Sequence, residues 1–346
     1  MEEEWRRLED QAEATLFQSW DWCDCWLDHC ARGRQPLILK AVSEGRTLAV
    51  APLLRQRSWF GLPLTRLAFI GTGPSDYGGF LALDESVDSR RALALALADE
   101  KFDLVDLHQV PESLASSFGD LLRDRFNVLA LTQEPTLKVA LPAGIDAYLS
   151  TLSKKFRTNT VYADRRLRRD FKYEQKIYKD ANELPAGMDT FFRLHQQRWL
   201  AKRLPGLFLG GSNRRFHLAL AGRLASRGRL VLSAAFLDGK PAAAFYGFKF
   251  GADYSYYLGG FDPALAKYSV STVLIFNLIK DALADDAKAF DFLRGQEAYK
   301  LRWGAKETPL YRLLVFPFTA RGRLAAGLAV RHNRIVQRAR AKLHKH

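Results

Sequence analysis

Short apolar runs recur along the chain, separated by turns, and they alternate with longer stretches of helical spacing. Two segments, 36–42 and 47–56, flank Glu44-Gly45, and two more, 229–237 and 241–250, flank Asp238-Gly239. Both arrangements predict β-hairpins. Further strands are predicted at 64–71, 78–83, 102–108, 127–132, 136–141, 173–178, 253–261, 289–293 and 310–316. Helices are predicted at 15–31, 86–100, 112–125, 145–171, 188–203, 213–227 and 269–284, the first of them capped by Ser19 or Asp21.

The order and spacing of these elements are alike in the two halves, which indicates an old duplication. We expect a mixed α/β (α+β) fold with two domains, each a mixed central sheet flanked by helices. The expected boundaries are 1–144, a basic helical connector at 145–172, a second domain at 173–317, and a basic amphipathic helix at 318–346.

Composition fits a globular protein, because 48% of the 346 residues are apolar and 12% are aromatic. No apolar run is long enough to span a bilayer, and the polar, acidic start does not resemble a secretory signal. We therefore expect a cytoplasmic protein. Cys23, Cys25 and Cys30 are expected to be reduced, partly buried thiols, and no metal site is expected.

The net charge of +14 is concentrated in two segments. Residues 154–172 hold eight Lys/Arg and two Asp, which gives +6, and residues 319–346 hold eight Lys/Arg and no acid, which gives +8. Such patches favour anionic partners: a phosphate-bearing substrate, anionic lipid or RNA. For the first segment, a solvated helix face is the alternative. For the second, a membrane-surface helix and a helix packed on its domain with solvated charges both remain open.

Ionisable groups of both signs crowd the stretch 289–304, where a predicted strand ends at Arg294-Gly295. Such crowding indicates a site, and an ion-paired corner is the alternative. The start of helix 269–284 could hold a pyrophosphate on its free backbone N–H groups, with ordinary capping by Ser269 or Ser271 as the alternative. Phosphate-binding loops of the GxxxxGK[ST] and GxGxxG kinds are missing from the sequence, as are HExxH and GxSxG.

Five segments between about 150 and 316 carry a family resemblance. They are FRTNTVYADRRLRRDF (156–171), LHQQRW (194–199), LSAAFLDGKPAAAFYGF (232–248), YYLGGFDPALAKYSVSTVLIFNLIKDAL (256–283) and FDFLRGQEAYKLRWGA (290–305). The second half resembles the acetyltransferase domain of CelD/BcsL-type proteins of the GNAT superfamily, and the related Fem-type aminoacyltransferases that branch peptidoglycan. The N-terminal helix and the hairpin with APLL (51–54) look like a first, degenerate GNAT copy. The resemblance therefore implies two tandem GNAT-like domains.

The resemblance implies a donor site in which an acyl thioester lies between strands 253–261 and 289–293. A backbone N–H near 258–260 would polarise the thioester carbonyl, and the helix start would bind the pyrophosphate. The implied co-substrate is acetyl-CoA or another acyl-CoA, with no permanently bound cofactor. The implied donor-binding residues are Leu258, Gly259, Gly260, Lys267, Ser269, Ser271 and Thr272.

Direct attack by an amine needs positioning and a route for the amine proton. Asp291 and Glu297 are the first candidates for proton removal, and His195 in LHQQRW is another. A buried structural histidine is the alternative for His195. The expected acceptor-binding residues are Arg198, Trp199, Arg294, Tyr299 and Lys300.

These features predict an N-acyltransferase that moves an acetyl or acyl group to an amine of a cell-envelope or exopolysaccharide precursor, such as an amino sugar or a lipid-linked saccharide. Ser269-Val270-Ser271 stands where relatives often carry glycine, which leaves room for a second reading with aminoacyl-tRNA as the donor and a peptidoglycan precursor as the acceptor. A third reading is a non-catalytic accessory protein of polysaccharide export. The basic last helix would hold the protein on the inner face of an anionic membrane.

Overall fold

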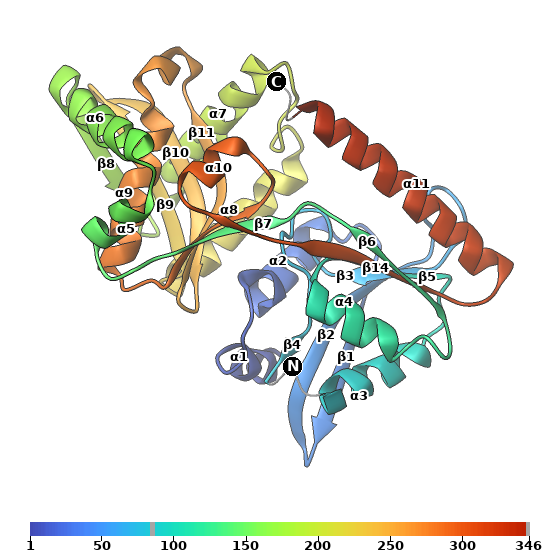
Figure 1. Cartoon of the computed structure of the whole chain (residues 1–346). Helices are drawn as coiled ribbons and strands as arrows, with labels where there is room; N and C mark the ends of the chain where they lie inside the picture. Colours follow the sequence, from blue (N-terminus) through green and yellow to red (C-terminus); the bar gives the residue numbers. More distant parts are fainter. Residues whose placement is uncertain (84–86, 344–346) are drawn as a thin grey trace. The chain divides into compact units, whose positions relative to one another are not determined.

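The computed structural model is a mixed α/β protein built around two mixed sheets, which confirms the predicted fold class (Figure 1). It describes residues 1–83 and 87–343, without the side chains of residues 87 and 340–343, so the end of the predicted helix 318–346 lies outside the described residues. The chain divides into two compact units. Unit 1 comprises Met1–Thr136, Arg294–Gln296 and Thr308–His346, and unit 2 comprises Leu137–Leu293 and Glu297–Glu307.

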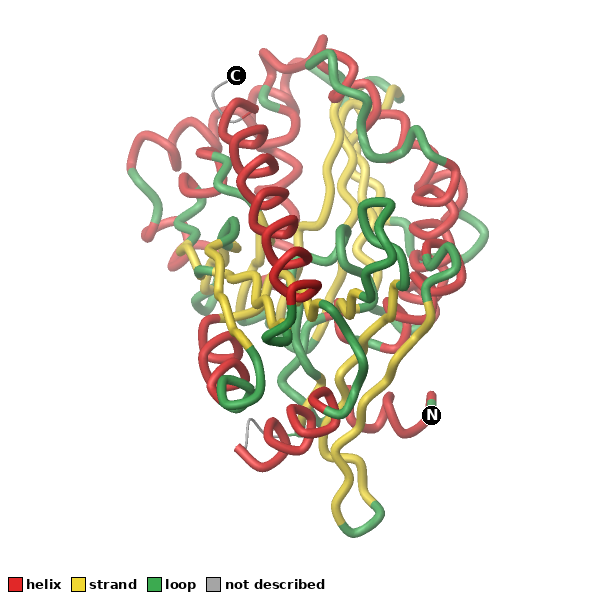
Figure 2. Tube along the Cα trace, turned by 90° about the vertical axis from the view of Figure 1, so that its right-hand side faces the viewer, coloured by secondary structure: helices red, strands yellow, loops and turns green. Residues whose placement is uncertain are grey.

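Unit 1 is a sheet with helices packed on both faces. Its helices are α1 (Glu2–Glu9), α2 (Trp20–Cys30), α3 (Val87–Ala98), α4 (Glu112–Asp120) and α11 (Ala320–Leu343). Its strands are β1 (Gln35–Ser43), β2 (Arg46–Gln56), β3 (Arg66–Phe69), β4 (Leu81–Ala82), β5 (Leu104–Pro111), β6 (Asn127–Thr132) and β14 (Leu310–Phe316). The strand order is β1-β2-β3-β5-β14-β6, and β4 pairs with β2. The predicted hairpin β1–β2 forms the two-stranded ribbon that projects in Figure 2.

The two faces of this sheet bury different helices because side chains alternate along each strand. Leu313 of β14 packs in the cluster that contains Leu93 of α3 and Phe118 of α4. Its neighbour Leu314 packs in the cluster that contains Ala325 and Ala329 of α11. Alternating residues of β14 thus lie in the cores of both faces.

Unit 2 is a second sheet with its own helices. Its helices are α5 (Ile145–Thr151), α6 (Lys154–Asp170), α7 (Leu184–Ala201), α8 (Gly211–Ser226), α9 (Val270–Ala284) and α10 (Ala298–Arg302), with a 3-10 turn at Pro263–Tyr268. Its strands are β7 (Thr136–Ala140), β8 (Tyr173–Ile177), β9 (Leu230–Leu237), β10 (Lys240–Phe250), β11 (Asp253–Phe261), β12 (Ala289–Arg294) and β13 (Lys306–Thr308). The strand order is β13-β7-β12-β11-β10-β9-β8. Phe245 of β10 belongs to the core that α9 completes, whereas Tyr246 contacts Phe191 of α7 on the other face.

Several local predictions hold, with shifted boundaries. The hydroxyl of Ser19 accepts a hydrogen bond from the N–H of Trp22 and caps α2, as predicted. The predicted helix 15–31 is broken, because a 3-10 turn at Leu16–Gln18 precedes α2. The connector 145–172 consists of two helices, α5 and α6, and α1 was not predicted.

Two strands lie in different sheets from those predicted. The sequence places 136–141 at the end of the first domain and 310–316 at the end of the second, yet β7 lies between β12 and β13, and β14 lies between β5 and β6. Each unit therefore receives one strand from the other half of the chain. Apart from β4 and β8, the two strand orders then correspond one to one, which supports the duplication.

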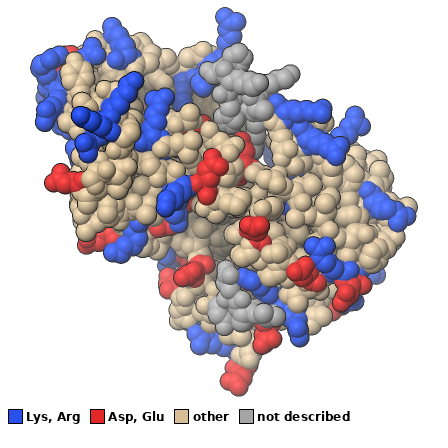
Figure 3. All heavy atoms as spheres, viewed as in Figure 1, with Lys and Arg blue, Asp and Glu red and all other residues tan. Residues whose placement is uncertain are grey.

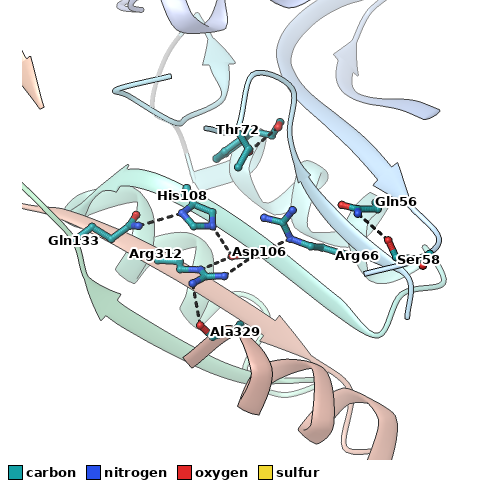
Figure 4. Close-up of polar contacts among 10 residues, drawn as sticks. Gln56, Ser58, Arg66, Thr72, Asp106, His108, Gln133, Arg312 and Ala329 are labelled. Carbon is teal, nitrogen blue, oxygen red and sulfur yellow. Dashed lines mark hydrogen bonds and ion pairs between the residues drawn. The ribbon is translucent and has the colours of Figure 1, made fainter. Parts of the chain in front are cut away.

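A buried ion cluster holds the exchanged strand in unit 1 (Figure 4). The guanidinium of Arg312 on β14 binds the carboxylate of Asp106 on β5 through two N–O contacts of 2.6 and 2.9 Å, and both side chains are buried. Arg312 also donates to the carbonyl of Ala329 in α11 at 3.0 Å. Nε of Arg66 and Nε2 of His108 lie 2.6 and 3.2 Å from the same carboxylate. One arginine therefore ties β14 to both β5 and α11.

Burial acts to raise the pKa of Asp106, but interactions with Arg66, His108 and Arg312 outweigh it and hold that pKa well below its ordinary value. Burial lowers the pKa of His108, against the attraction of Asp106. A neutral His108 can donate from Nε2 to the carboxylate while Nδ1 accepts from Gln133, whose Nε2 lies 3.1 Å away. The cluster is therefore charged at Asp106 and at both arginines.

We predict that Arg312→Leu lowers the free energy of unfolding by about 3 kcal/mol or more, because it removes one partner of a buried ion pair. Urea denaturation of the full chain measures the change. The matched control is Arg123→Leu, since Arg123 pairs with Asp120 at 2.8 Å on the exposed surface of the same unit. That control should cost less than about 1 kcal/mol. Equal losses in the two variants would contradict a special role for the buried pair.

Candidate active site

The two central strands of unit 2 diverge after a short paired stretch. The parallel pairs between β11 and β12 are Asp253–Ala289, Tyr254–Phe290 and Ser255–Asp291. A β-bulge at Tyr257 in β11 follows directly, where the register with β10 shifts by one residue. Bulges redirect backbone groups and bend strands, so this one lies where β11 turns away from β12. The separation of strands that the resemblance implies is therefore present.

A cavity of about 160 Å³ lies at this divergence. Its lining comes from β10, β11, α6, α7, α9 and α10. The residues are Phe156, Arg198, Ala243, Ala244, Phe245, Tyr256, Gly259, Gly260, Phe261, Ser271, Thr272, Leu274, Ile275, Tyr299, Arg302 and Trp303. Most of them are apolar or aromatic, and the few polar groups enter from α7, α9 and α10. An apolar pocket with a few convergent polar groups is the usual form of a small-molecule site.

Two tyrosines give the cavity its hydrogen-bonding groups. The hydroxyls of Tyr256 and Tyr299 are hydrogen-bonded to each other. Burial raises the pKa of both, that of Tyr299 well above its ordinary value, and the nearby carboxylate of Glu297 acts in the same direction. The guanidinium of Arg198 opposes the shift. Both hydroxyls therefore stay protonated near neutral pH and can donate hydrogen bonds.

Glycines let two groups approach β11 closely. A Cβ on Gly259 would lie 2.0 Å from the hydroxyl oxygen of Tyr256, so the tyrosine needs a glycine there. A Cβ on Gly260 would lie 2.2 Å from the backbone nitrogen of His195, so α7 packs directly on the strand. Arg198 of α7 donates from Nη1 to the carbonyl of Gly259 at 3.2 Å. The divergent end of β11 is thus held by α7.

The start of α9 reaches the cavity, and α6 packs beside α9. Ser271 and Thr272, in the first turn of α9, line the cavity, and their backbone N–H groups have no partner within the helix. Ser269 precedes the helix in the left-handed conformation, with φ of 57°. The guanidinium of Arg166 in α6 lies over the ring of Tyr268, 4.9 Å from its centre, just before that turn. A helix N-terminus with basic side chains near it is suited to a phosphate.

Lys and Arg side chains gather over α6 (Figure 3). Arg166, Arg168 and Arg169 have partners in Asp164 or Asp170. The other exposed bases on the helix have no acidic partner among the described residues; they are Lys154, Lys155 and Arg165. The helix therefore keeps uncompensated positive charge.

Six of the predicted site residues line the cavity. They are Arg198, Gly259, Gly260, Ser271, Thr272 and Tyr299. They come from α7, β11, α9 and α10, so the structure brings together segments that are far apart in the sequence. Leu258, Lys267 and Ser269 do not line it. Leu258 is next to the lining residue Gly259 and Ser269 directly precedes α9, whereas Lys267 lies in the 3-10 turn before that helix.

Asp291 does not line the cavity. Phe290 and Phe292 point to the core on the cavity face, and alternation along β12 puts Asp291 on the opposite face. Its side chain is 3% exposed, and one carboxylate oxygen accepts a hydrogen bond of 2.7 Å from the N–H of Leu293. Leu293 has φ of 56°, an unusual value for a branched residue. This geometry favours a structural role in shaping the end of β12.

His195 is buried among aromatic rings instead of facing the cavity. Its Nε2 accepts a hydrogen bond of 2.9 Å from the indole N–H of Trp199. Burial, with the nearby charge of Arg198, lowers its pKa to about 4, so it is neutral at pH 7. Phe208 lies between it and a second buried histidine, His217. His195 and Trp199 thus form part of a core, and they support α7 behind Arg198.

The remaining predicted residues fall outside the lining. Glu297, at the start of α10, binds Nζ of Lys300 at 2.9 Å, and Lys300 is buried. Arg294 belongs to unit 1, where its guanidinium lies 3.1 Å from a carboxylate oxygen of Asp76. Arg294 is therefore not among the residues that line the cavity.

The most informative residue missed by sequence reasoning is Tyr256. It lies in the stretch Tyr254–Tyr257, which holds three tyrosines where β11 turns away from β12. This concentration of aromatic residues could have indicated the site from the sequence. The bulge at Tyr257 changes which side chains share a face, and that shift is not visible in the sequence. Phe156, which stacks edge-on against Trp303 at 4.9 Å, was also missed.

Residues 154–301 match the family model described as an acetyltransferase (GNAT) domain. This segment runs from α6 to α10 and contains most of the cavity lining. This segment, less than half of the chain, is therefore a GNAT-type acetyltransferase domain by its family model. Comparison with curated protein sequences gives no match.

Among solved structures the chain is similar in fold to FemX, with 12% identity, a TM-score of 0.70, and coverage of 92% of this chain and 96% of that one. It is also similar to L-PGS from Bacillus licheniformis (13% identity, TM-score 0.58, 91% of each chain). A third similar structure is the C-terminal domain of a putative lysylphosphatidylglycerol synthetase from Agrobacterium fabrum (14% identity, TM-score 0.56, 95% of each chain). These likenesses extend over both units and concern the fold.

We predict that stability falls as pH is lowered from 7 to 5, because His195 and His217 are buried and neutral in the folded state. Burial lowers the pKa of His217 to about 3. The unfolded chain takes up protons below its histidine pKa of about 6.5 while the folded chain does not, so stability is lost toward acid, by about 2 kcal/mol per histidine at pH 5. Urea denaturation at both pH values measures the loss, and His217→Phe should reduce it. An unchanged pH slope in that variant would assign the loss to other groups.

Proposed function

We propose that the protein is an N-acyltransferase whose donor thioester occupies the cavity lined by β10, β11, α9 and α10. The observation that carries the proposal is the cavity itself, which reaches from the first turn of α9 to the Tyr256–Tyr299 pair. In this arrangement the N–H groups of Ser271 and Thr272 bind the donor's pyrophosphate. The acyl arm of the donor lies along the apolar residues that line the cavity, such as Leu274.

The chemistry is attack of an amine nitrogen on the thioester carbonyl, in which a C–N bond forms and the C–S bond breaks. A backbone N–H of the divergent part of β11 stabilises the carbonyl oxygen as negative charge develops. Tyr299, kept protonated by burial, donates a hydrogen bond to the leaving sulfur. The carboxylate of Glu297, close enough to shift the pKa of that hydroxyl, accepts the amine proton through water.

The proposed acceptor is an amine of a cell-envelope or exopolysaccharide precursor, as expected for a CelD/BcsL-type protein. Arg302 at the mouth of the cavity is exposed and suits an anionic group such as a phosphate on that acceptor. Arg198 already binds the carbonyl of Gly259, so it positions the strand.

A second donor, aminoacyl-tRNA, is favoured by two specific observations. The fold likeness to FemX and to the lysylphosphatidylglycerol synthetase spans the whole chain. In addition, Lys154, Lys155 and Arg165 carry charge without acidic partners among the described residues, on a helix that packs beside the α9 start. Phosphate contacts of tRNA would use such charge.

We predict that acetyl-CoA binds the full-length protein by calorimetry and that Ser271→Glu weakens binding at least tenfold, because it places a negative charge against the donor phosphates. Ser212→Glu is the matched control, since it makes the same change in the first turn of α8, away from the cavity. Retained acetyl-CoA affinity in the Ser271 variant would overturn the placement of the pyrophosphate. No heat with acetyl-CoA, together with binding of charged tRNA that is lost when the three α6 bases are replaced, would favour the second donor.

We further predict that Tyr299→Phe lowers kcat about tenfold or more while donor affinity and the unfolding free energy change little. Release of thiol from acetyl-CoA, with glucosamine and hydroxylamine as acceptor amines, measures turnover. Asp291→Asn provides the contrast, because a residue that shapes the strand end should alter stability more than turnover. A large loss of turnover in the Asp291 variant at unchanged stability would return proton removal to Asp291.

A further inference from the structure

The last helix, α11, buries a different face from the one its large apolar residues predict. The residues that face the sheet are small or polar: Gly322, Ala325, Ala326, Ala329 and Asn333. They recur at the spacing of one helix face, and Ala325, Ala326 and Ala329 pack against Trp59, Leu64, Leu104 and Leu314. Leu328 and Val330 are partly buried against the same core, so the packed face leaves out Leu324 and Ile335.

Large apolar side chains remain on the outward face. Leu324 is 51% exposed and Ile335 is 57% exposed, and the two share one face of the helix, whereas Leu328 between them is half-buried and packs against the core. Phe318, two residues before the helix, is 59% exposed. Single exposed apolar residues are common, but a row of them on one helix face indicates a surface that binds something.

Arginines flank this apolar row. Arg331, Arg334 and Arg338 line an open groove of about 600 Å³ together with Ile335. None of the three has an acidic partner among the described residues, and the sequence from Thr319 to His346 contains no acid at all. The charge on this face therefore stays uncompensated within the described part of the chain.

We propose that the outward face of α11 docks on the surface of a membrane that contains anionic lipid. A helix lying in the interface inserts its apolar row at the boundary of headgroups and acyl chains, while long arginine side chains reach up to the lipid phosphates. Nucleic acid shares the phosphate chemistry, but it gives no environment for exposed Leu324 and Ile335. No described helix of the chain is long and apolar enough to cross a bilayer.

The inference concerns unit 1 and does not depend on the donor that unit 2 binds. Deleting α11 would be an ambiguous test, because the helix closes a core and its Ala329 carbonyl binds the buried Arg312. Point changes on the outward face avoid this difficulty, since the side chains concerned are exposed.

The test is sedimentation of the full-length protein with vesicles of equal parts phosphatidylglycerol and phosphatidylcholine, and with vesicles of phosphatidylcholine alone. We expect binding to the anionic vesicles only. Arg331→Gln with Arg338→Gln, and separately Leu324→Ser with Ile335→Ser, should each reduce the bound fraction at least tenfold. The charge-matched control is Arg123→Gln with Arg125→Gln, two exposed arginines elsewhere in unit 1, which should bind as the unchanged protein does.

Each other outcome overturns the proposal. If the unchanged protein does not sediment, or if the control loses binding as the α11 variants do, the face is not a docking site. If only the arginine variant loses binding, the apolar row does not insert. Competition by unfractionated tRNA that is abolished by the α11 changes, without vesicle binding, would assign the face to nucleic acid.

Discussion

The buried pair of Asp106 and Arg312 is the interaction on which the architecture of unit 1 depends. Its two members lie 206 positions apart in the sequence, and a single buried charge of either kind would be costly in an apolar core. Pairing them fixes β14 beside β5, and the bond from Arg312 to Ala329 then fixes α11 over the same strands. A strand held by apolar contacts alone could pair in a shifted register or detach from the sheet. A charged pair with two defined N–O contacts specifies a single register.

The same position in the two repeats has diverged. The parallel strands β3 and β5 pair through Ala68–Asp106, and β11 and β12 pair through Ser255–Asp291, each as the third residue pair. Asp106 and Asp291 are therefore equivalent by register. In unit 1 the carboxylate binds two arginines, and in unit 2 it accepts a hydrogen bond from the N–H of Leu293 at the end of its own strand. The cavity of unit 2 is lined by Tyr256 and Tyr299 and not by Asp291.

Local structure was readable from the sequence, and long-range pairing was not. Turn residues such as Asp238-Gly239 identify a hairpin because the information lies within a few residues. By contrast, the alternating pattern of segments 136–141 and 310–316 would be the same in either sheet. The sequence therefore could not show that each of these strands joins the sheet of the other half of the chain. The cavity was predicted in part because Gly259, Gly260 and Tyr299 sit in recognisable segments. For α11 the sequence left a membrane-surface helix and a packed helix open, and it did not reveal that Ala325 and Ala329 would lie in the core under the helix.

The exchanged strand also governs how the protein can be made. Asp106 and Arg312 are separated by 206 positions in the sequence. At a synthesis rate of roughly 5–20 residues per second, the ribosome would need about 10–40 s to supply the arginine after the aspartate has been added. During that interval the nascent first sheet has a gap between β5 and β6 and an acidic group facing it. Unit 1 therefore cannot finish folding as a separate domain while the chain is being synthesised. Its sheet is completed only after nearly the whole polypeptide has been made.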